Sequence, residues 1–141
     1  MHPTEQILND IKNKLEISVD GLKTVLWVDI KPDLEDLPVC IITVGGEVIS
    51  DYHNHFYRVE LDVELKFIAI DEGFNRDVTK LLTIINDADA ILKDVSTRLD
   101  TIMRFSEIAT SEVTDTVDAE RPMLVATRTY GITYKRTRGL S

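Results

Sequence analysis

The stretch Phe56–Ile70, FYRVELDVELKFIAI, carries the clearest structural signal in the sequence. Its apolar members are Val59, Leu61, Val63, Leu65 and Phe67, and they alternate with Glu60, Asp62, Glu64 and Lys66. Successive side chains of a β-strand point to opposite faces, so a period of two predicts a long strand with one buried face and one face in water. Such strands are typical of antiparallel sheets, and the rest of the chain must cover the apolar face.

Two segments have the spacing of amphipathic helices and can provide that cover. The first is expected over 4–18 and the second over 75–95, with Thr4 and Asn75 as N-caps. The apolar residues of the second helix are Val78, Leu81, Leu82, Ile85, Ala88, Leu92 and Val95. Both helices are expected to pack on the same face of the sheet, through Ile11, Leu15, Leu82 and Ile85.

Two segments between the first helix and the central strand are rich in β-branched residues. The segment 22–30 predicts a strand, and the continuously apolar segment 39–44 predicts an inner strand covered on both faces. Gly45-Gly46 is expected to end that inner strand. The stretch that follows, up to Asn54, fits either the second arm of a hairpin or an irregular excursion.

The last third of the chain predicts a long hairpin. Its arms are 104–113 and 123–136, and the acidic segment 114–122 is the connection between them. The order of elements predicts the α+β class: a mainly antiparallel sheet of about 4–6 strands with two helices packed on one face. No linker divides the sequence, so 1–141 is expected to be a single domain, with 134–141 as a flexible basic C-terminal end.

Composition excludes several classes of protein. The chain has 141 residues and a formal net charge of −9, which disfavours binding of nucleic acid over a broad surface. No apolar run is long enough for a membrane helix, and the first residues lack the pattern of a signal peptide. Cys40 is the only cysteine, which permits no intramolecular disulfide and fits a reducing cytoplasm.

The motifs of catalysis are largely missing from the sequence. No phosphate-binding glycine loop and no serine nucleophile elbow occurs. His53 and His55, with Asp51 nearby, are the best metal candidates, but two histidines alone define no site. Cys40 lies in the most apolar segment and is expected to be a buried, inert thiol, and Trp27 is expected to be a core or interface anchor. We therefore predict no catalytic residue, no metal and no cofactor.

Three groups of charged residues remain as candidates for function. The acids of the central strand stand about 7 Å apart, which allows paired catalytic carboxylates, but three acids in a row are the ordinary pattern of the solvated face of a half-buried strand, and we prefer that interpretation. The second group lies in the 114–122 connection, and the third is basic and lies near the C-terminus. The groups are Glu60, Asp62 and Glu64; Asp115, Asp118 and Glu120; and Lys135, Arg136 and Arg138.

The order of these elements resembles that of the tail-terminator, or tail-completion, proteins of tailed bacteriophages and prophages. The resemblance covers about Thr4 to Tyr134 and rests on hydrophobic pattern rather than on an invariant motif. It is carried by the segments Leu22–Ile30, Pro38–Ile42, Tyr57–Leu65, Leu81–Ile85 and Tyr130–Tyr134. Gly45–Asn54 and 114–122 have no counterpart that we can anchor in the family pattern.

The resemblance implies a small noncatalytic subunit that forms a ring, typically a hexamer, which caps the tail tube and joins it to the head. Its partners would be further copies of itself, the tail-tube protein and a head-completion protein, in the host cytoplasm during assembly and then in the virion tail. DNA would pass through the ring without specific binding, along a lumen lined by at least one of the two acidic groups. The basic C-terminal group would meet an acidic neighbour.

Two other classes of function stay open at this point. One is a noncatalytic cytoplasmic binding or adaptor module, monomeric or dimeric. The other is a small metal-dependent hydrolase that uses His53, His55 and nearby acids. The mass of the particle in solution separates the adaptor from a ring-forming protein, and metal analysis separates the hydrolase from both.

Overall fold

Strand β3, Phe56–Ile70, lies at the centre of a six-stranded sheet. The computed structural model describes residues 3–19, 21–27, 37–53, 56–70, 75–98, 102–110, 114–118 and 121–137. The strand order is β1-β2-β3-β6-β4, and β5 also pairs with β6. The other elements are α1 (Pro3–Ser18), β1 (Thr24–Trp27), β2 (Val39–His53), α2 (Asn75–Arg98), β4 (Ile102–Thr110), β5 (Thr114–Asp118) and β6 (Arg121–Thr137).

The sheet is mainly antiparallel, as predicted. β3 pairs with β2 on one side and, along its whole length, with β6 on the other, from Phe56 opposite Thr137 to Ile70 opposite Met123. β4 and β5 pair with different parts of β6, both antiparallel. Only β1 runs parallel to its neighbour β2. The chain therefore belongs to the α+β class.

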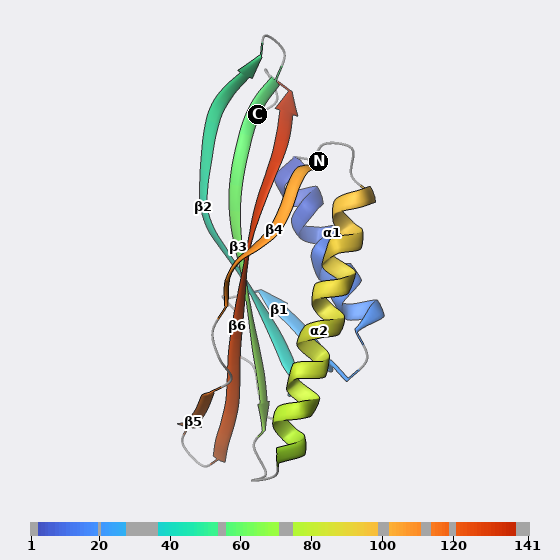
Figure 1. Cartoon of the computed structure of the whole chain (residues 1–141), viewed down its shortest axis with the longest axis vertical. Helices are drawn as coiled ribbons and strands as arrows, with labels where there is room; N and C mark the ends of the chain where they lie inside the picture. Colours follow the sequence, from blue (N-terminus) through green and yellow to red (C-terminus); the bar gives the residue numbers. More distant parts are fainter. Residues whose placement is uncertain are drawn as a thin grey trace.

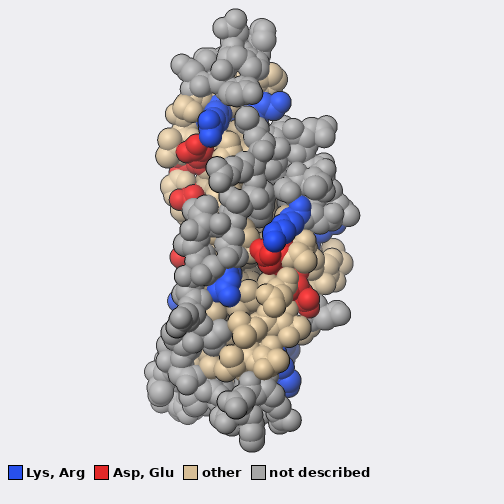
Figure 2. All heavy atoms as spheres, in the orientation of Figure 1, with Lys and Arg blue, Asp and Glu red and all other residues tan. Residues whose placement is uncertain are grey.

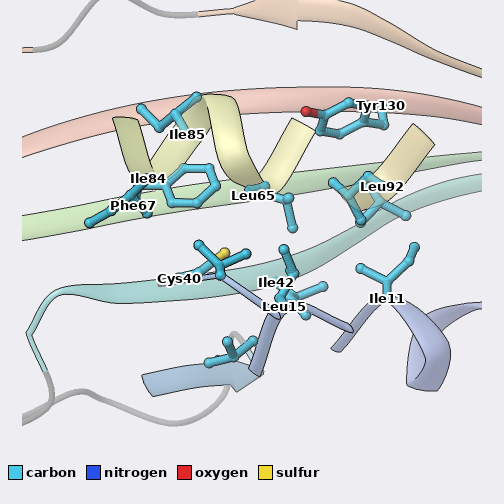
Figure 3. Packing of buried hydrophobic residues seen from close by; sticks show 14 of the residues in the cluster. Ile11, Leu15, Cys40, Ile42, Leu65, Phe67, Ile84, Ile85, Leu92 and Tyr130 are labelled. Atoms are coloured by element: carbon cyan, nitrogen blue, oxygen red, sulfur yellow. The ribbon is translucent and has the colours of Figure 1, made fainter. Parts of the chain in front are cut away.

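Both helices cover the same face of the sheet (Figure 1), which confirms the predicted layer arrangement. The five apolar residues of the alternating pattern in β3 are all buried, from Val59 to Phe67. Figure 3 shows where the layers meet: Ile11 and Leu15 of α1 and Leu92 of α2 lie over side chains of the strands. Burial of this core between the helices and the sheet is the main stabilising contribution, because the apolar stripe of each helix packs against the buried apolar side chains of the sheet.

The prediction that Leu82 contacts the sheet is wrong. Its side chain is 38% exposed, whereas Leu81 and Ile85 are buried and Ile84, which the sequence pattern left out, is also buried. Leu82 follows Leu81 by one residue, which is about 100° around the helix. It therefore lies on the flank of the apolar stripe that Leu81, Ile85, Ala88 and Leu92 define.

Gly45-Gly46 does not end the strand that was predicted over 39–44. β2 continues through both glycines to His53, so neither a separate hairpin arm nor an irregular excursion follows them. The register shifts between Val44 and Glu47, where the two glycines lie opposite Asp62 alone. This is a β-bulge, and it lets the strand carry on after a kink. The expected cover on both faces holds at Val39 and Cys40, which are both buried.

Three further boundaries differ from the prediction. Residues 114–118 of the expected connection form strand β5, because they pair with the first residues of β6. β6 extends to Thr137 and pairs with β3 up to that residue, so 134–137 are strand rather than a flexible end, and 138–141 lie outside the described residues. The strand expected over 22–30 is observed over Thr24–Trp27, with 28–30 outside the described residues.

The contrast between Ile85 and Leu82 gives a matched test of the helix–sheet contact. Ile85→Ala removes a buried side chain and is expected to lower the free energy of unfolding by about 2–5 kcal/mol. Leu82→Ala, on the half-exposed flank, is expected to cost less than about 1 kcal/mol. Urea unfolding followed by circular dichroism measures both. Equal losses for the two variants would contradict the assigned helix face.

Candidate functional site

The face of the sheet opposite the helices carries a column of three acidic side chains. Glu60, Asp62 and Glu64 project from successive outward positions of β3, and we call them the acidic column. Glu60 and Asp62 are exposed and Glu64 is half-buried. In the part of the chain that the structure describes, no helix covers this face (Figure 1). The column therefore faces solvent in a single subunit.

Small and uncharged residues flank the acidic column on both neighbouring strands. On β2 the positions in register are Thr43, the Gly45-Gly46 bulge and Val48, and on β6 they are Thr129, Gly131 and Thr133. None of these positions holds a basic side chain. At one end, Arg58 of the same strand forms an ion pair with Glu60, with 3.1 Å between Nη2 and Oε1. Both side chains of that pair are about half exposed, so the pair contributes little to stability.

The glycine bulge brings the backbone of β2 close to the acidic column. A Cβ placed on Gly45 would lie 3.2 Å from Cβ and 3.3 Å from the carbonyl oxygen of Asp62. A Cβ on Gly46 would meet no atom within 4 Å. Only Gly45 is therefore required for the close approach of the two strands.

The bulge also decides which face the second half of β2 presents. Before it, Val44 pairs with the inward-facing Val63, and after it, Glu47 pairs with the inward-facing Leu61. Strict alternation through both glycines, with no bulge, would instead put Glu47 on the acidic side and Val48 on the helix side. The bulge thus places Glu47 on the helix side and Val48 on the acidic side.

Glu47 there accepts two contacts from β6. Arg136 Nη1 lies 3.1 Å and the Tyr134 hydroxyl 3.4 Å from Glu47 Oε1. The Arg136 side chain is only 13% exposed. Lys135 lies on the opposite face, with Nζ 5.4 Å from the centroid of the Phe56 ring, a cation–π contact. The two described members of the predicted basic group are therefore on different faces, and Arg138 lies outside the described residues.

The two predicted acidic groups lie in different parts of the sheet. Asp115 pairs with Leu124, whereas Glu64 at the nearer end of the acidic column pairs with Thr129. Five residues of β6 separate these positions, which is about 17 Å along a strand. Asp118 lies further away, at the end of β5, and Glu120 lies outside the described residues. The structure thus does not join the groups into one acidic surface.

The remaining candidates from the sequence are the two histidines, the cysteine and the tryptophan. His53 is the last residue of β2, in register with Phe56, and His55 lies outside the described residues. Among the described residues, no group of three or more His, Cys, Asp or Glu side chains is placed to hold a metal ion. Cys40 is fully buried, and its burial raises the pKa of the thiol, which disfavours the reactive thiolate. Trp27 is half-buried and packs against the core.

Sequence reasoning missed an unpaired edge of the sheet. β1 pairs only with Val39–Ile42, and no described strand pairs with that side of β2 beyond it. We call residues 43–53 the β2 free edge. Exposed large apolar side chains concentrate there: Val44 is 39%, Val48 61% and Ile49 48% exposed, and they are three of the five such residues in the described chain. The apolar pair Val48-Ile49 after the glycines was the available signal.

Neither the pocket beside α2 nor the distribution of charge over the described surface indicates a particular ligand. A shallow pocket between α2 and the ends of β2 and β3 is lined by apolar side chains and one charged residue, Lys80. It lacks the converging polar groups of a substrate site. On the face displayed in Figure 2, the described acidic and basic side chains are interspersed rather than gathered by sign.

Comparison with known proteins gives no family assignment. No protein-family model matches the chain, and a search of curated proteins finds no match. Neither helix, over the residues described, has the length and apolar character needed to cross a membrane.

The two glycines provide a test of the bulge beside the acidic column. Gly45→Ala is expected to destabilise the protein by about 1–3 kcal/mol, because its Cβ is forced against the backbone of Asp62. Gly46→Ala is the matched control and is expected to leave stability unchanged or slightly raised. Thermal unfolding of both variants measures the difference. A Gly46→Ala loss as large as that of Gly45→Ala would argue against the observed bulge.

Proposed function

We propose that this chain is a structural assembly protein of a phage or prophage tail, a tail terminator whose copies form a ring that caps the tail tube and joins it to the head. The observation that carries the proposal is the β2 free edge. An unpaired strand with exposed apolar side chains is a template for association with another chain, and a closed ring removes it from solvent. The subunit is thus suited to assembly rather than to catalysis.

The acidic column supports the same proposal. The helices cover one face of the sheet, and the acidic column lies on the other. A ring with its helices outward would present Glu60, Asp62 and Glu64 of every copy to the central opening. Carboxylates repel the phosphates of DNA, so DNA would pass along such a lumen without adhering. The net charge of −9 favours the same behaviour.

The same free edge also fits a second candidate, a noncatalytic binding or adaptor module. Extended peptides add to unpaired sheet edges in many recognition modules. The candidates differ in mass, because an adaptor would stay monomeric or dimeric while a terminator would form a closed ring, expected to be a hexamer. Light scattering after size-exclusion chromatography, together with virion assembly in a complementation test, distinguishes them. A monomer that fails to restore virion assembly would overturn the tail-terminator proposal.

Charge reversal tests the acidic lumen. Glu60→Lys with Glu64→Lys is expected to leave folding intact, because these outward side chains contribute little to stability. In the ring, the double variant is expected to retain DNA at low salt, with affinity falling steeply as salt rises. DNA retention on a filter measures this, and virion assembly is expected to fall in parallel.

Glu5→Lys with Asp87→Lys is the matched control. It makes the same change in net charge at exposed positions of α1 and α2, on the helix side. This control is expected to bind DNA no better than the unaltered protein. If both double variants retain DNA equally, the effect comes from net charge and the acidic column does not line the opening.

A further inference from the structure

The sheet has two edges that flank the same segment of β3 and β6. Between Val59 and Glu64, β3 is paired with β2 on one side and with β6 on the other, and β6 is paired in turn with β4. The register runs in rows across all four strands. One row is Ile49, Val59, Tyr134 and Ile102, and another is Thr43, Glu64, Thr129 and Ala109. The β2 free edge and β4 are therefore level with each other along the strands.

The two edge strands, β2 and β4, run in directions that allow antiparallel pairing between two copies of the chain. Every pair from β2 through β3 and β6 to β4 is antiparallel. With four strands that alternate in direction, the two outer strands run opposite ways. A second copy rotated about an axis along the strands keeps its strand directions, so its β4 would lie antiparallel to β2 of the first copy. The alternation of the sheet would then continue across the contact.

Charge favours this pairing over the pairing of two β2 edges. The β2 free edge contains two acids, Glu47 and Asp51, and no Lys or Arg, whereas β4 contains one acid, Glu107, and Arg104, which is in register with the outward-facing Thr133. Two copies of β2 side by side would bring acidic strands together, and like charges on facing strands are destabilising. The β2 free edge also contains no Lys or Pro, the residues that commonly protect an edge from pairing.

We infer that the β2 free edge binds β4 of a second copy of this chain, so that one antiparallel sheet continues from subunit to subunit. The inference rests on the proposed ring and specifies its contact. Because the contact joins two different surfaces, it is heterologous and repeats around the ring until it closes. The same rotation keeps all helices on one side of the continuous sheet and all acidic columns on the other.

Paired cysteines test this contact in the full-length protein. Val48→Cys is combined in one chain with Arg104→Cys, Ser106→Cys or Ala109→Cys, so that different staggers of the two edges are covered. A short bifunctional maleimide is expected to link at least one combination into a ladder of covalent multimers on a denaturing gel. Cys40 remains in place, because it is buried. Ile17→Cys with Ser106→Cys is the control, since Ile17 is 83% exposed and lies on α1.

The single variants identify the partner. A mixture of Val48→Cys and Ser106→Cys chains is expected to give dimers, and Val48→Cys alone is expected to give none. Dimers from Val48→Cys alone would instead show pairing of two β2 edges and overturn the inference. Assembled rings in which no β2–β4 combination is linked more than the control would also overturn it, while leaving the proposed function standing.

An edge-blocking variant gives an independent readout. Val48→Lys with Ile49→Lys is expected to reduce the oligomer to a monomer while the melting temperature of the subunit changes by only a few degrees, because both residues are about half exposed or more. Ile17→Lys with Leu82→Lys makes the same change on the helices and is expected to leave assembly unchanged. Assembly of the edge variant at the unaltered mass would contradict the inference. If the unaltered protein itself forms no ring and restores no virion assembly, the proposed function is refuted as well.

Discussion

The structure depends on the one-sided burial of β3. Its side chains alternate between the core and solvent, and each pairing register therefore fixes which residues of β2 and β6 are buried. A slip of one residue would move Val59, Leu61 and Val63 into water and the acidic column into the core. The long ladder with β6 and the two helices on one face follow from this constraint, because that face of β3 carries its buried apolar side chains from Val59 to Phe67.

The glycine bulge modifies this constraint at one place. It lets β2 kink around Asp62 and exchanges the faces of the residues that follow. Glu47 can then meet Tyr134 and Arg136 on the helix side, while Val48 lies beside the acidic column. The contact between Glu47 and Arg136 joins β2 to β6 across β3. It lies in the same half of β2 as the exposed apolar side chains of Val48 and Ile49.

The sequence predicted what depends on local periodicity. The alternation of β3 and the apolar spacing of the helices indicated the fold class and most of the core, including Ile11, Leu15 and Ile85. It did not predict features that depend on pairing between distant segments. Gly45-Gly46 is a turn signal when the sequence is taken alone, and it becomes a bulge because β3 pairs on both sides of it. Leu82 and Ile84 are both apolar and belong to the same turn of α2, so counting apolar residues does not tell which of them is buried. The free edge of β2 depends on how far β1 reaches, which no local pattern encodes.

Hydrogen exchange tests most directly whether copies of this chain assemble through the β2 free edge. Backbone amides of an unpaired edge exchange fast, and new ladder hydrogen bonds slow them. Comparison of the dilute subunit with the assembled particle by mass spectrometry is predicted to show new protection at residues 43–53 and 102–110, with little change in α1 and α2. Assembled particles in which protection rises on the helices and stays unchanged at the β2 free edge would contradict assembly through this edge.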